Sequence, residues 1–407
     1  MLNVTKCRSF LGMLLLLAWT EGLHAQTSPP HPYPVQLSNG KLLGDVPGDP
    51  RPTNNFPTVA VVSPDGRFAV LLHSGYGAYS SGEKQSLTVL NLETNELRDF
   101  PDERLGHDAK QTYFLGLAFS VDGKHLYASM ASLTDPLGKG KGSTGNGIAV
   151  YGFANGVVAP ERFLALLPRE KLPQGKVRRE QFKDVTYPAG LSAGMSGGEE
   201  RILVACNGSD EAVLLNASSG KIVSRFDLST YPRIPGSLPY TAIMTRDGRR
   251  GFVSLWNASA VAELDLVNGS VRRMVPLQKP AVPSAGGSHP TALLLNHDDS
   301  RLFVALTNRD EIDVLDPNTG KVLITFSTKL PGQKYGGSDP ESLALAPDEK
   351  TLFSANAISD TVGVFDLSHP DKNKHRGAGR FIPTEFYPTV VAATARDLLI
   401  ASAKGRG

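Results

Sequence analysis

The stretch His289–Asn308, HPTALLLNHDDSRLFVALTN, contains the pattern that decides the fold. A residue followed by proline precedes a short apolar run, a polar turn follows at His297-Asp298-Asp299, and a second apolar run ends at Asn308. Further copies begin at Phe56-Pro57, Tyr187-Pro188, Leu238-Pro239, Asp339-Pro340 and Tyr387-Pro388, and a weaker copy without the proline covers 113–130. Self-similarity of this kind is the signature of a repeat protein.

The period of the repeat predicts the architecture. From Pro188 onward the leading prolines, at 188, 239, 290, 340 and 388, are 51, 51, 50 and 48 residues apart. This period fits a four-stranded propeller blade, which cannot bury both of its faces without neighbours. We therefore expect an all-β, seven-bladed β-propeller with four-stranded antiparallel blades. A helical solenoid is disfavoured, because the chain has 41 Gly and 29 Pro and no long helical periodicity with caps.

The last copy of the repeat is incomplete. After Tyr387-Pro388 the chain offers only two strands, Thr389–Ala393 and Leu398–Ala403. Residues 33–46 have the pattern of a hairpin around Ser38-Asn39-Gly40, since Asn-Gly is a strong hairpin signal. We expect this hairpin to complete the seventh blade and so remove two exposed sheet edges. The alternative is an unstructured Pro-rich leader.

The N-terminus has the features of an export signal. Residues 1–25 combine Lys6 and Arg8 with the apolar run 11–19 and a small residue, Ala25, at the end, which is typical of a secretory signal peptide. An uncleaved interfacial anchor is the alternative. We expect residues 26–407 to form a single extracytoplasmic domain, periplasmic or secreted and not bound to a membrane. With 42 basic and 40 acidic residues, the chain has no global charge for attracting nucleic acid.

The repeat resembles the YVTN-type β-propeller family. The matching stretches end in asparagine, at 203–207, 302–308 and 352–356, and two of them are followed by the Val-x-Val-x-Asp-like runs 312–316 and 362–366. A narrower resemblance is to exported proteins in which such a propeller precedes a phosphoesterase domain, since Lys404-Gly405-Arg406-Gly407 is similar to their Gly-rich exit. The resemblance implies the fold and leaves the ligand open, because members bind varied partners.

Propeller geometry predicts one candidate binding face. The starts of first strands and the ends of second strands lie on the same side of a propeller, near its central channel, and such hollows commonly hold ligands. We expect a polar and aromatic funnel there, formed by Tyr113, Tyr187, Asn207, Tyr240, Asn257, His289, Asn308, Arg309, Asp339, Asn356 and Tyr387. Each of these residues could instead have a structural role, because asparagine often caps strands. The insertions 133–146 and 167–183, the second of them rich in Lys and Arg, are further candidates for recognition.

No catalytic, metal or cofactor motif stands out. The nine His are scattered without the spacing of a zinc site, and neither a nucleophile motif nor a phosphate-binding loop is present. We therefore expect a non-catalytic scaffold without a cofactor, monomeric, that binds an unknown protein or small molecule at the funnel. Two alternatives stay open: a propeller that works beside a phosphoesterase, and a lactonase-like hydrolase, for which Asp339, His289 and Arg309 would be the candidate residues.

Overall fold

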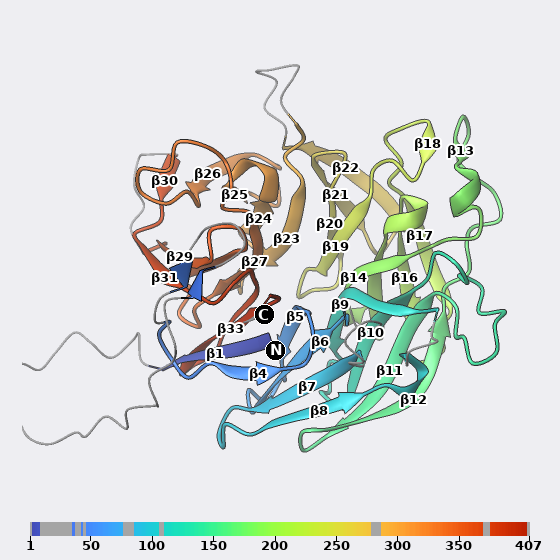
Figure 1. Ribbon diagram of the computed structural model, residues 1–407. Coiled ribbons are helices and arrows are strands. Elements are labelled where there is room, and N and C mark those ends of the chain that lie inside the picture. The colour runs from blue at the N-terminus through green and yellow to red at the C-terminus, as the bar shows by residue number, and fades with distance from the viewer. Residues whose placement is uncertain are drawn as a thin grey trace, which may run out of the picture.

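The chain folds as a β-propeller, in which sheets are arranged around a central axis (Figure 1). The computed structural model describes residues 46–75, 85–105, 110–277, 286–368 and 376–404, and the backbone alone of residues 2–8, 35–36, 42–43 and 375. The innermost strands contact one another in the circular order β5, β9, β14, β19, β23, β27 and β32, and β32 returns to β5. The prediction of an all-β propeller is confirmed.

Six blades each contain four antiparallel strands that follow one another in chain order from the axis outward. Blade 1 contains β5 (Pro57–Val62), β6 (Phe68–His73), β7 (Ser86–Asn91) and β8 (Leu97–Pro101). Blade 2 contains β9 (Thr112–Phe119), β10 (His125–Ala131), β11 (Gly147–Ala154) and β12 (Val157–Ala165). Blade 3 contains β14 (Pro188–Ser196), β15 (Glu199–Cys206), β16 (Glu211–Asn216) and β17 (Ile222–Asp227).

The remaining three of these blades follow the same order. Blade 4 contains β19 (Pro239–Met244), β20 (Arg250–Leu255), β21 (Ala260–Asp265) and β22 (Ser270–Pro276). Blade 5 contains β23 (Pro290–Leu295), β24 (Leu302–Leu306), β25 (Glu311–Leu315) and β26 (Val322–Ser327), to which β30 (His375–Gly377) adds in parallel. Blade 6 contains β27 (Pro340–Leu345), β28 (Thr351–Asn356), β29 (Thr361–Asp366) and β31 (Arg380–Pro383).

Short elements connect the blades. They are the 3₁₀ helices η1 (Glu103–Leu105), η2 (Glu180–Phe182), η3 (Asn207–Ser209) and η4 (Thr307–Arg309), and the parallel pair β13 (Val177–Arg178) and β18 (Arg233–Ile234). Among the residues that the structure describes, no helix is long and apolar enough to cross a bilayer.

The two chain ends share one further sheet, which we call the end sheet. Its order is β32 (Pro388–Ala393), β33 (Asp397–Ser402), β1 (Leu2–Arg8) and β4 (Arg51–Thr53), and Figure 1 marks both termini beside it. The prediction of seven blades, the last of them completed by the hairpin 33–46, is corrected to six, and within the described residues β1 and not this hairpin pairs with β33. Within that hairpin, β2 (Val35–Gln36) pairs with β3 (Leu42–Leu43) alone. After pairing with β32, the strand β33 has one edge left, and such an edge is a template for pairing with another strand. In the structure β1 pairs with that edge.

Turn residues explain where the strands end. Gly66, Gly123 and Gly248, in the first hairpin turns of blades 1, 2 and 4, have φ of 71°, 70° and 64°, which glycine adopts without a steric penalty. In blade 1 the Asp65 carboxylate accepts a hydrogen bond from the Ser63 hydroxyl at 2.6 Å and completes the turn. Equivalent turns in blades 5 and 6 place Asp299 and Glu349 at φ of 55° and 54°. The predicted Asp-Gly turns are confirmed.

The apolar core lies between neighbouring blades. Phe68 of blade 1 packs edge-on against Phe153 of blade 2, with ring centroids 5.5 Å apart. Phe326 of blade 5 contacts Phe365 of blade 6 at 5.1 Å, and both rings are buried. Each such aromatic pair contributes roughly 0.5–1.5 kcal/mol beyond its area burial. Each sheet buries its faces against the sheets on either side, so the ring stabilises itself through its own continuity.

A repeated hydrogen-bonded clamp joins blade to blade. After the second strand of blade 3, Asp210 adopts φ of 48°, and its buried carboxylate accepts the N–H groups of Gly236, Ser237 and Leu238 at 2.7–3.1 Å. Two blades later, Asp310 accepts the N–H groups of 337–339 at 2.7–3.1 Å. Asp360 accepts the N–H of Tyr387 at 3.0 Å, and in blade 4 the Ser259 hydroxyl accepts the N–H of Ser288.

The clamp holds a strained backbone. The residues before the leading prolines all have positive φ, between 49° and 64°, namely Phe56, Tyr187, Leu238, His289, Asp339 and Tyr387. Non-glycine residues avoid this region, and a following proline further restricts the backbone. Three of these residues, Leu238, Asp339 and Tyr387, donate their N–H directly to a clamp carboxylate. The clamp thus stabilises the sharp turn by which the chain enters the next inner strand.

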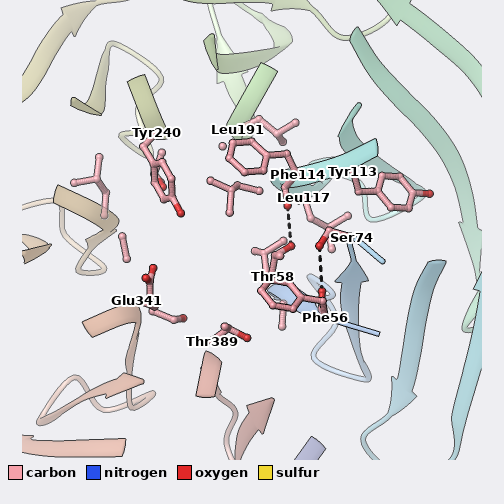
Figure 2. Close-up of a pocket in the computed structure, with 18 of the residues that line it drawn as sticks. Phe56, Thr58, Ser74, Tyr113, Phe114, Leu117, Leu191, Tyr240, Glu341 and Thr389 are labelled. Atoms are coloured by element: carbon pink, nitrogen blue, oxygen red, sulfur yellow. Dashed lines mark hydrogen bonds between the residues drawn. The ribbon is translucent and has the colours of Figure 1, made fainter. Parts of the chain in front are cut away.

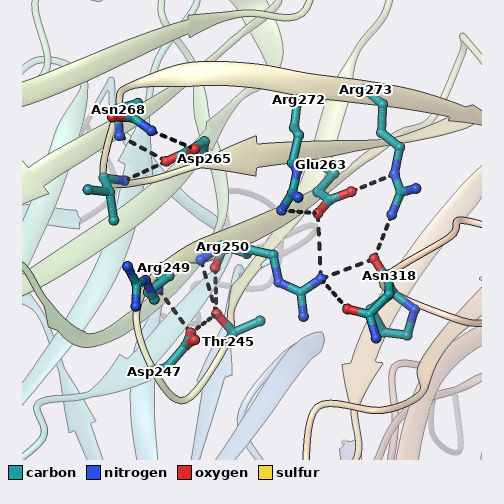
Figure 3. A network of polar contacts seen from close by, with 12 residues as sticks. Thr245, Asp247, Arg249, Arg250, Glu263, Asp265, Asn268, Arg272, Arg273 and Asn318 are labelled. Atoms are coloured by element: carbon teal, nitrogen blue, oxygen red, sulfur yellow. Dashed lines mark hydrogen bonds and ion pairs between the residues drawn. The ribbon is translucent and has the colours of Figure 1, made fainter.

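A second connection joins blades 4 and 5 farther from the axis. The buried Glu263 of β21 forms ion pairs with Arg250, Arg272 and Arg273 of the two flanking strands, as Figure 3 shows. Arg250 and Arg273 also donate to the Pro317 carbonyl oxygen of blade 5, at 3.1 and 2.6 Å. A carboxylate with three guanidinium partners is compensated despite its burial, and it orients the arginines toward the next blade.

Replacing Asp210 by alanine should destabilise the protein by about 3 kcal/mol, because three buried N–H groups lose their acceptor. Asp210→Asn should cost less, since one acceptor oxygen is retained. The matched control is Asp316→Ala, because Asp316 also accepts a backbone N–H, that of Asn318, but in an exposed turn. The measurement is the denaturant midpoint of each variant. An Asp210→Ala midpoint equal to that of Asp316→Ala would contradict the clamp.

Candidate functional site

A cavity of about 670 Å³ lies at the centre of the ring. Its volume is within the range of small-molecule sites, about 300–1,000 Å³. Every innermost strand contributes to the wall, among others through Thr58, Phe114, Leu191, Tyr240, Leu293, Glu341 and Thr389 (Figure 2). The wall is thus a product of the whole ring, since no two of these residues come from the same blade.

Glycines allow the inner strands to come this close. A Cβ atom on Gly190 of β14 would lie 2.7 Å from the Cα of Thr241 and from the carbonyl oxygen of Tyr240 on β19. A Cβ atom on Gly116 of β9 would lie 2.4 Å from the carbonyl oxygen of Ala189. Any larger residue at either position would push two blades apart at the cavity wall.

The residue after the leading proline normally links one blade to the next. In blade 1 the hydroxyl of Thr58 donates to the carbonyl oxygen of Phe114 in blade 2 at 2.8 Å. Thr291 of blade 5 donates to Pro340 of blade 6 at 3.3 Å. Thr389 of the end sheet donates to Pro57 of blade 1 at 2.6 Å. Threonine at this position therefore has a structural task that recurs around the ring.

Two residues at the same position of the repeat carry a large polar side chain instead. Blade 4 has Tyr240 and blade 6 has Glu341 where the other blades with a leading proline have threonine or alanine. Figure 2 shows both side chains at the cavity, with the Tyr240 hydroxyl and the Glu341 carboxylate on the same side of it. Within the described chain, neither polar group has a hydrogen-bond or ion-pair partner. These two groups are therefore available to a ligand.

The electrostatics of this part of the cavity are unusual. Glu341 keeps some accessible surface where it borders the cavity, yet burial by the surrounding protein, with a smaller effect of Asp339, raises the pKa of its carboxyl group to about 8. Burial and the neighbouring Asp310 raise the pKa of Asp339 to about 6. Burial, Glu341 and Asp339 raise the pKa of Tyr387 to about 12. Carboxyl groups whose pKa values lie this far above their usual range are candidates for functional groups.

Of the residues predicted for the funnel, three line the cavity: Tyr113, Tyr240 and Tyr387. The hydroxyl of Tyr113 points away from it, as Figure 2 shows, and lies 2.5 Å from that of Tyr151, which donates to Asp102 at 2.6 Å. Tyr113 thus forms a buried polar chain between blades 1 and 2. Tyr187 packs edge-on against Phe114, and His289 stacks on Trp256 with ring centroids 3.8 Å apart.

The predicted asparagines act within the protein. The side-chain amides of Asn207, Asn257 and Asn308 donate to the carbonyl oxygens of Pro239, Gly236 and Gly287 at 2.7–3.1 Å. Asn356 is buried and accepts from the Ser354 hydroxyl at 2.8 Å. The first three contacts connect the ends of second strands to the segments that lead into first strands. These three asparagines therefore have a structural role, which was the alternative to ligand binding.

The three residues considered for a lactonase-like site do not form one constellation. Arg309 pairs with Glu311 at 3.3 Å, His289 stacks on Trp256, and Asp339 donates its N–H to Asp310. None of the three lines the cavity, and no contact between them is found in the described part of the chain. No group of three or more His, Cys, Asp or Glu is placed to hold a metal ion among the described residues.

The two insertions are held by internal contacts. In 133–146, the Asp135 carboxylate accepts the N–H groups of Lys139 and Gly140 at 2.8 and 2.9 Å. In 167–183, Arg169 forms an ion pair with the buried Glu211 at 2.8 Å, and the ammonium group of Lys176 donates to the Ser229 carbonyl oxygen at 2.9 Å. Part of the positive charge of the second insertion is therefore used inside the protein.

Glu341 was not among the residues predicted from the sequence. A signal for it was present, because aligning the repeats on their leading prolines places Thr58, Ala189, Tyr240, Thr291, Glu341 and Thr389 in one column. A carboxylate in a column of mostly small residues is the exception. That Glu341 and three other members of this column line the cavity follows only from the tertiary structure.

Comparisons with known proteins support the fold. No family model and no curated protein sequence matches the chain. Among solved structures, the chain is similar to the periplasmic gluconolactonase PpgL of Pseudomonas aeruginosa, with 16% identity, a TM-score of 0.57 and 99% of each chain covered. It is also similar to a streptogramin B lyase, with 13% identity, a TM-score of 0.55 and 86% and 94% of the two chains covered. The β-propeller domain of Myceliophteria thermophila Cps50 (Swd1) matches at 12% identity and a TM-score of 0.54, with 86% and 98% covered.

Glu341→Gln should stabilise the protein increasingly as the pH rises from about 4.5 to about 8. The folded state raises the pKa of Glu341 from 4.5 to about 8, so the wild type loses stability as pH rises through this window and the glutamine does not. The measurement is the melting temperature of both proteins at pH 5, 7 and 9, with a higher value for the variant at pH 9. The exposed Glu93→Gln serves as the control. A difference that does not change with pH would contradict the burial of an uncompensated carboxyl group.

Proposed function

We propose that this chain is an extracytoplasmic binding propeller that takes a small molecule into its central cavity. The observation that carries the proposal is the exchange of a structural threonine for Tyr240 and Glu341, which leaves two polar groups facing a cavity of about 670 Å³. Buried polar groups in proteins nearly always have partners. A bound molecule would supply the partner that the described chain does not.

A hydrolase is the second candidate, and one observation favours it. Asp339 and Glu341 have pKa values of about 6 and about 8, and such separated carboxyl groups can act as a base and an acid near neutral pH. The similarity to a gluconolactonase makes lactones the substrates to test. Against this candidate, the described part of the cavity wall contains no basic residue to stabilise a developing oxyanion. The phosphoesterase alternative has no support in the described chain, since residues 405–407 lie outside it.

Export and ring closure belong to the same proposal. If residues 1–25 are removed as a signal peptide, β1 leaves with them, and the edge of β33 opens. We infer that the hairpin 33–46 then pairs with β33, as the Asn-Gly hairpin pattern favours, and that the end sheet acts as the seventh blade. Thr389 already links this sheet to blade 1 at 2.6 Å.

Binding in the cavity is tested with two substitutions. A fragment collection is screened by the rise in melting temperature, and the hits are titrated by calorimetry. Tyr240→Phe and Glu341→Gln should each reduce the affinity of the protein for the hits by about tenfold, which corresponds to about 1.4 kcal/mol for one lost hydrogen bond. Glu93→Gln should leave the affinity unchanged. Hits whose affinity neither substitution alters would contradict binding at this site.

Catalysis is tested on the same proteins with a series of lactones at pH 5 to 9. The proposal of a binding protein predicts no turnover above the rate in buffer. Turnover that is lost in both Glu341→Gln and Asp339→Asn would overturn it in favour of the hydrolase.

The closure of the ring is tested with chains that start at Gln26 and at Pro47. We expect the first to melt at the same temperature as the full chain and the second several degrees lower, because only the first retains the hairpin. Equal melting temperatures of the two shortened chains would contradict closure by residues 33–46.

A further inference from the structure

The polar groups of the central cavity are unequally available to a ligand. The hydroxyls of Thr58 and Thr389 donate to carbonyl oxygens of neighbouring blades, and Thr112 donates to Gln85 at 2.8 Å. Glu341 is the only charged residue of the cavity wall that the structure describes, and the described wall contains no Lys, Arg or His. The cavity therefore offers one ionisable carboxyl group and no positive charge.

Aromatic rings line the same cavity as this carboxyl group. Phe56, Phe114, Tyr240 and Tyr387 all line the cavity, and Phe114 meets Tyr240 edge-on with ring centroids 6.2 Å apart. The faces of aromatic rings carry partial negative charge and attract cations within about 6 Å. At the mouth, the chain itself uses one of these faces, since the Lys404 ammonium nitrogen lies 4.1 Å from the centroid of the Tyr387 ring.

We propose that the ligand of the central cavity is an organic cation, whose ammonium group lies against Glu341 and the aromatic rings and whose apolar part fills the rest of the cavity. The inference rests on the proposed binding function and names its ligand class. An anion would meet the carboxyl group of Glu341, and no basic residue of the described wall would compensate it. A bare metal ion is disfavoured, because no group of three or more His, Cys, Asp or Glu is placed to hold one in the described chain.

The groups around Glu341 fit this ligand class. The strands packed against β27 are β23, β24, β28 and β32, and none of them contains a titratable residue. The titratable groups nearby are Asp339 just before β27 with Asp310 beside it, His289 before β23, Tyr387 before β32, and Tyr240 on the same side of the cavity. Lys404 lies over Tyr387. Burial first, and Asp339 second, raise the pKa of Glu341, and a bound cation opposes both effects.

Binding a cation should therefore ionise Glu341. The carboxyl group releases its proton to the solvent, and the carboxylate pairs with the ammonium group of the ligand, so that charge and atoms balance. Because the pKa of the free site is about 8, cations should bind more tightly at pH 9 than at pH 6, and proton release should be largest below pH 8.

The test uses probes that differ in charge, and the choline and 3,3-dimethylbutan-1-ol among them are isosteric. Choline and benzyltrimethylammonium are the cations, 3,3-dimethylbutan-1-ol and benzyl alcohol are the neutral counterparts, and benzoate is the anion. Each probe is titrated by calorimetry into the purified full chain, at pH 6, 7 and 9 and in two buffers of different ionisation enthalpy. We expect the cations to bind at least tenfold more tightly than their neutral counterparts at pH 9, and to release close to one proton per site at pH 7.

Two variants show whether the effect belongs to this site. Glu341→Gln should reduce the affinity for cations by at least tenfold and abolish proton release, whereas Glu93→Gln should change neither. Cations that bind Glu341→Gln as they bind the wild type would overturn the proposal, as would tighter binding of the neutral or anionic probes. In the latter case the cavity still binds small molecules, so the proposed function survives. If no probe of any charge binds, both the ligand class and the proposed function fail.

Discussion

This propeller depends on one repeated set of hydrogen bonds. In each of them, a side chain that follows the second strand of a blade binds the backbone that leads into the innermost strand of the next blade. Asp210, Asp310 and Asp360 each occupy a left-handed conformation and bind N–H groups that lie 26 to 29 residues farther along the chain. Each of these contacts determines how one blade follows another. Without them, the residues before the leading prolines would have to hold a positive φ unaided, which costs of order 1–3 kcal/mol each.

The clamp also determines where the inner strands lie, and thereby creates the cavity. Four of the residues that follow the leading prolines line the cavity, and in blades 1 and 5 and the end sheet the residue at this position is a threonine that binds the neighbouring blade. Where the repeat has threonine, the hydroxyl group is therefore already hydrogen-bonded to the neighbouring blade and is not free to bind a ligand. The groups available for chemistry are the exceptions to the repeat, Tyr240 and Glu341. They stand at the same position of the repeat, and their polar groups have no hydrogen-bond partner in the described chain.

This division between repeat and exception explains why the fold says little about the ligand. The solved structures that share the architecture include a gluconolactonase, a lyase and a propeller domain, at 12–16% identity. Their common part is the stacking of four-stranded sheets, which depends on apolar strands and turns rather than on particular polar residues. A carboxyl group among aromatic rings is a property of this chain, and its function must be argued from that site.

The sequence by itself determined the strands, their turns and the propeller, because these follow from short-range patterns: apolar runs, Asp-Gly turns and a period of about 50 residues between leading prolines. It predicted a binding face but not the roles of the residues on it, since Asn257 and Asn308 bind backbone carbonyl groups. Only the tertiary structure decided that Glu341 borders the cavity and that β1 pairs with β33. Both depend on which distant segments the closed ring brings together, and a local pattern carries no information about that.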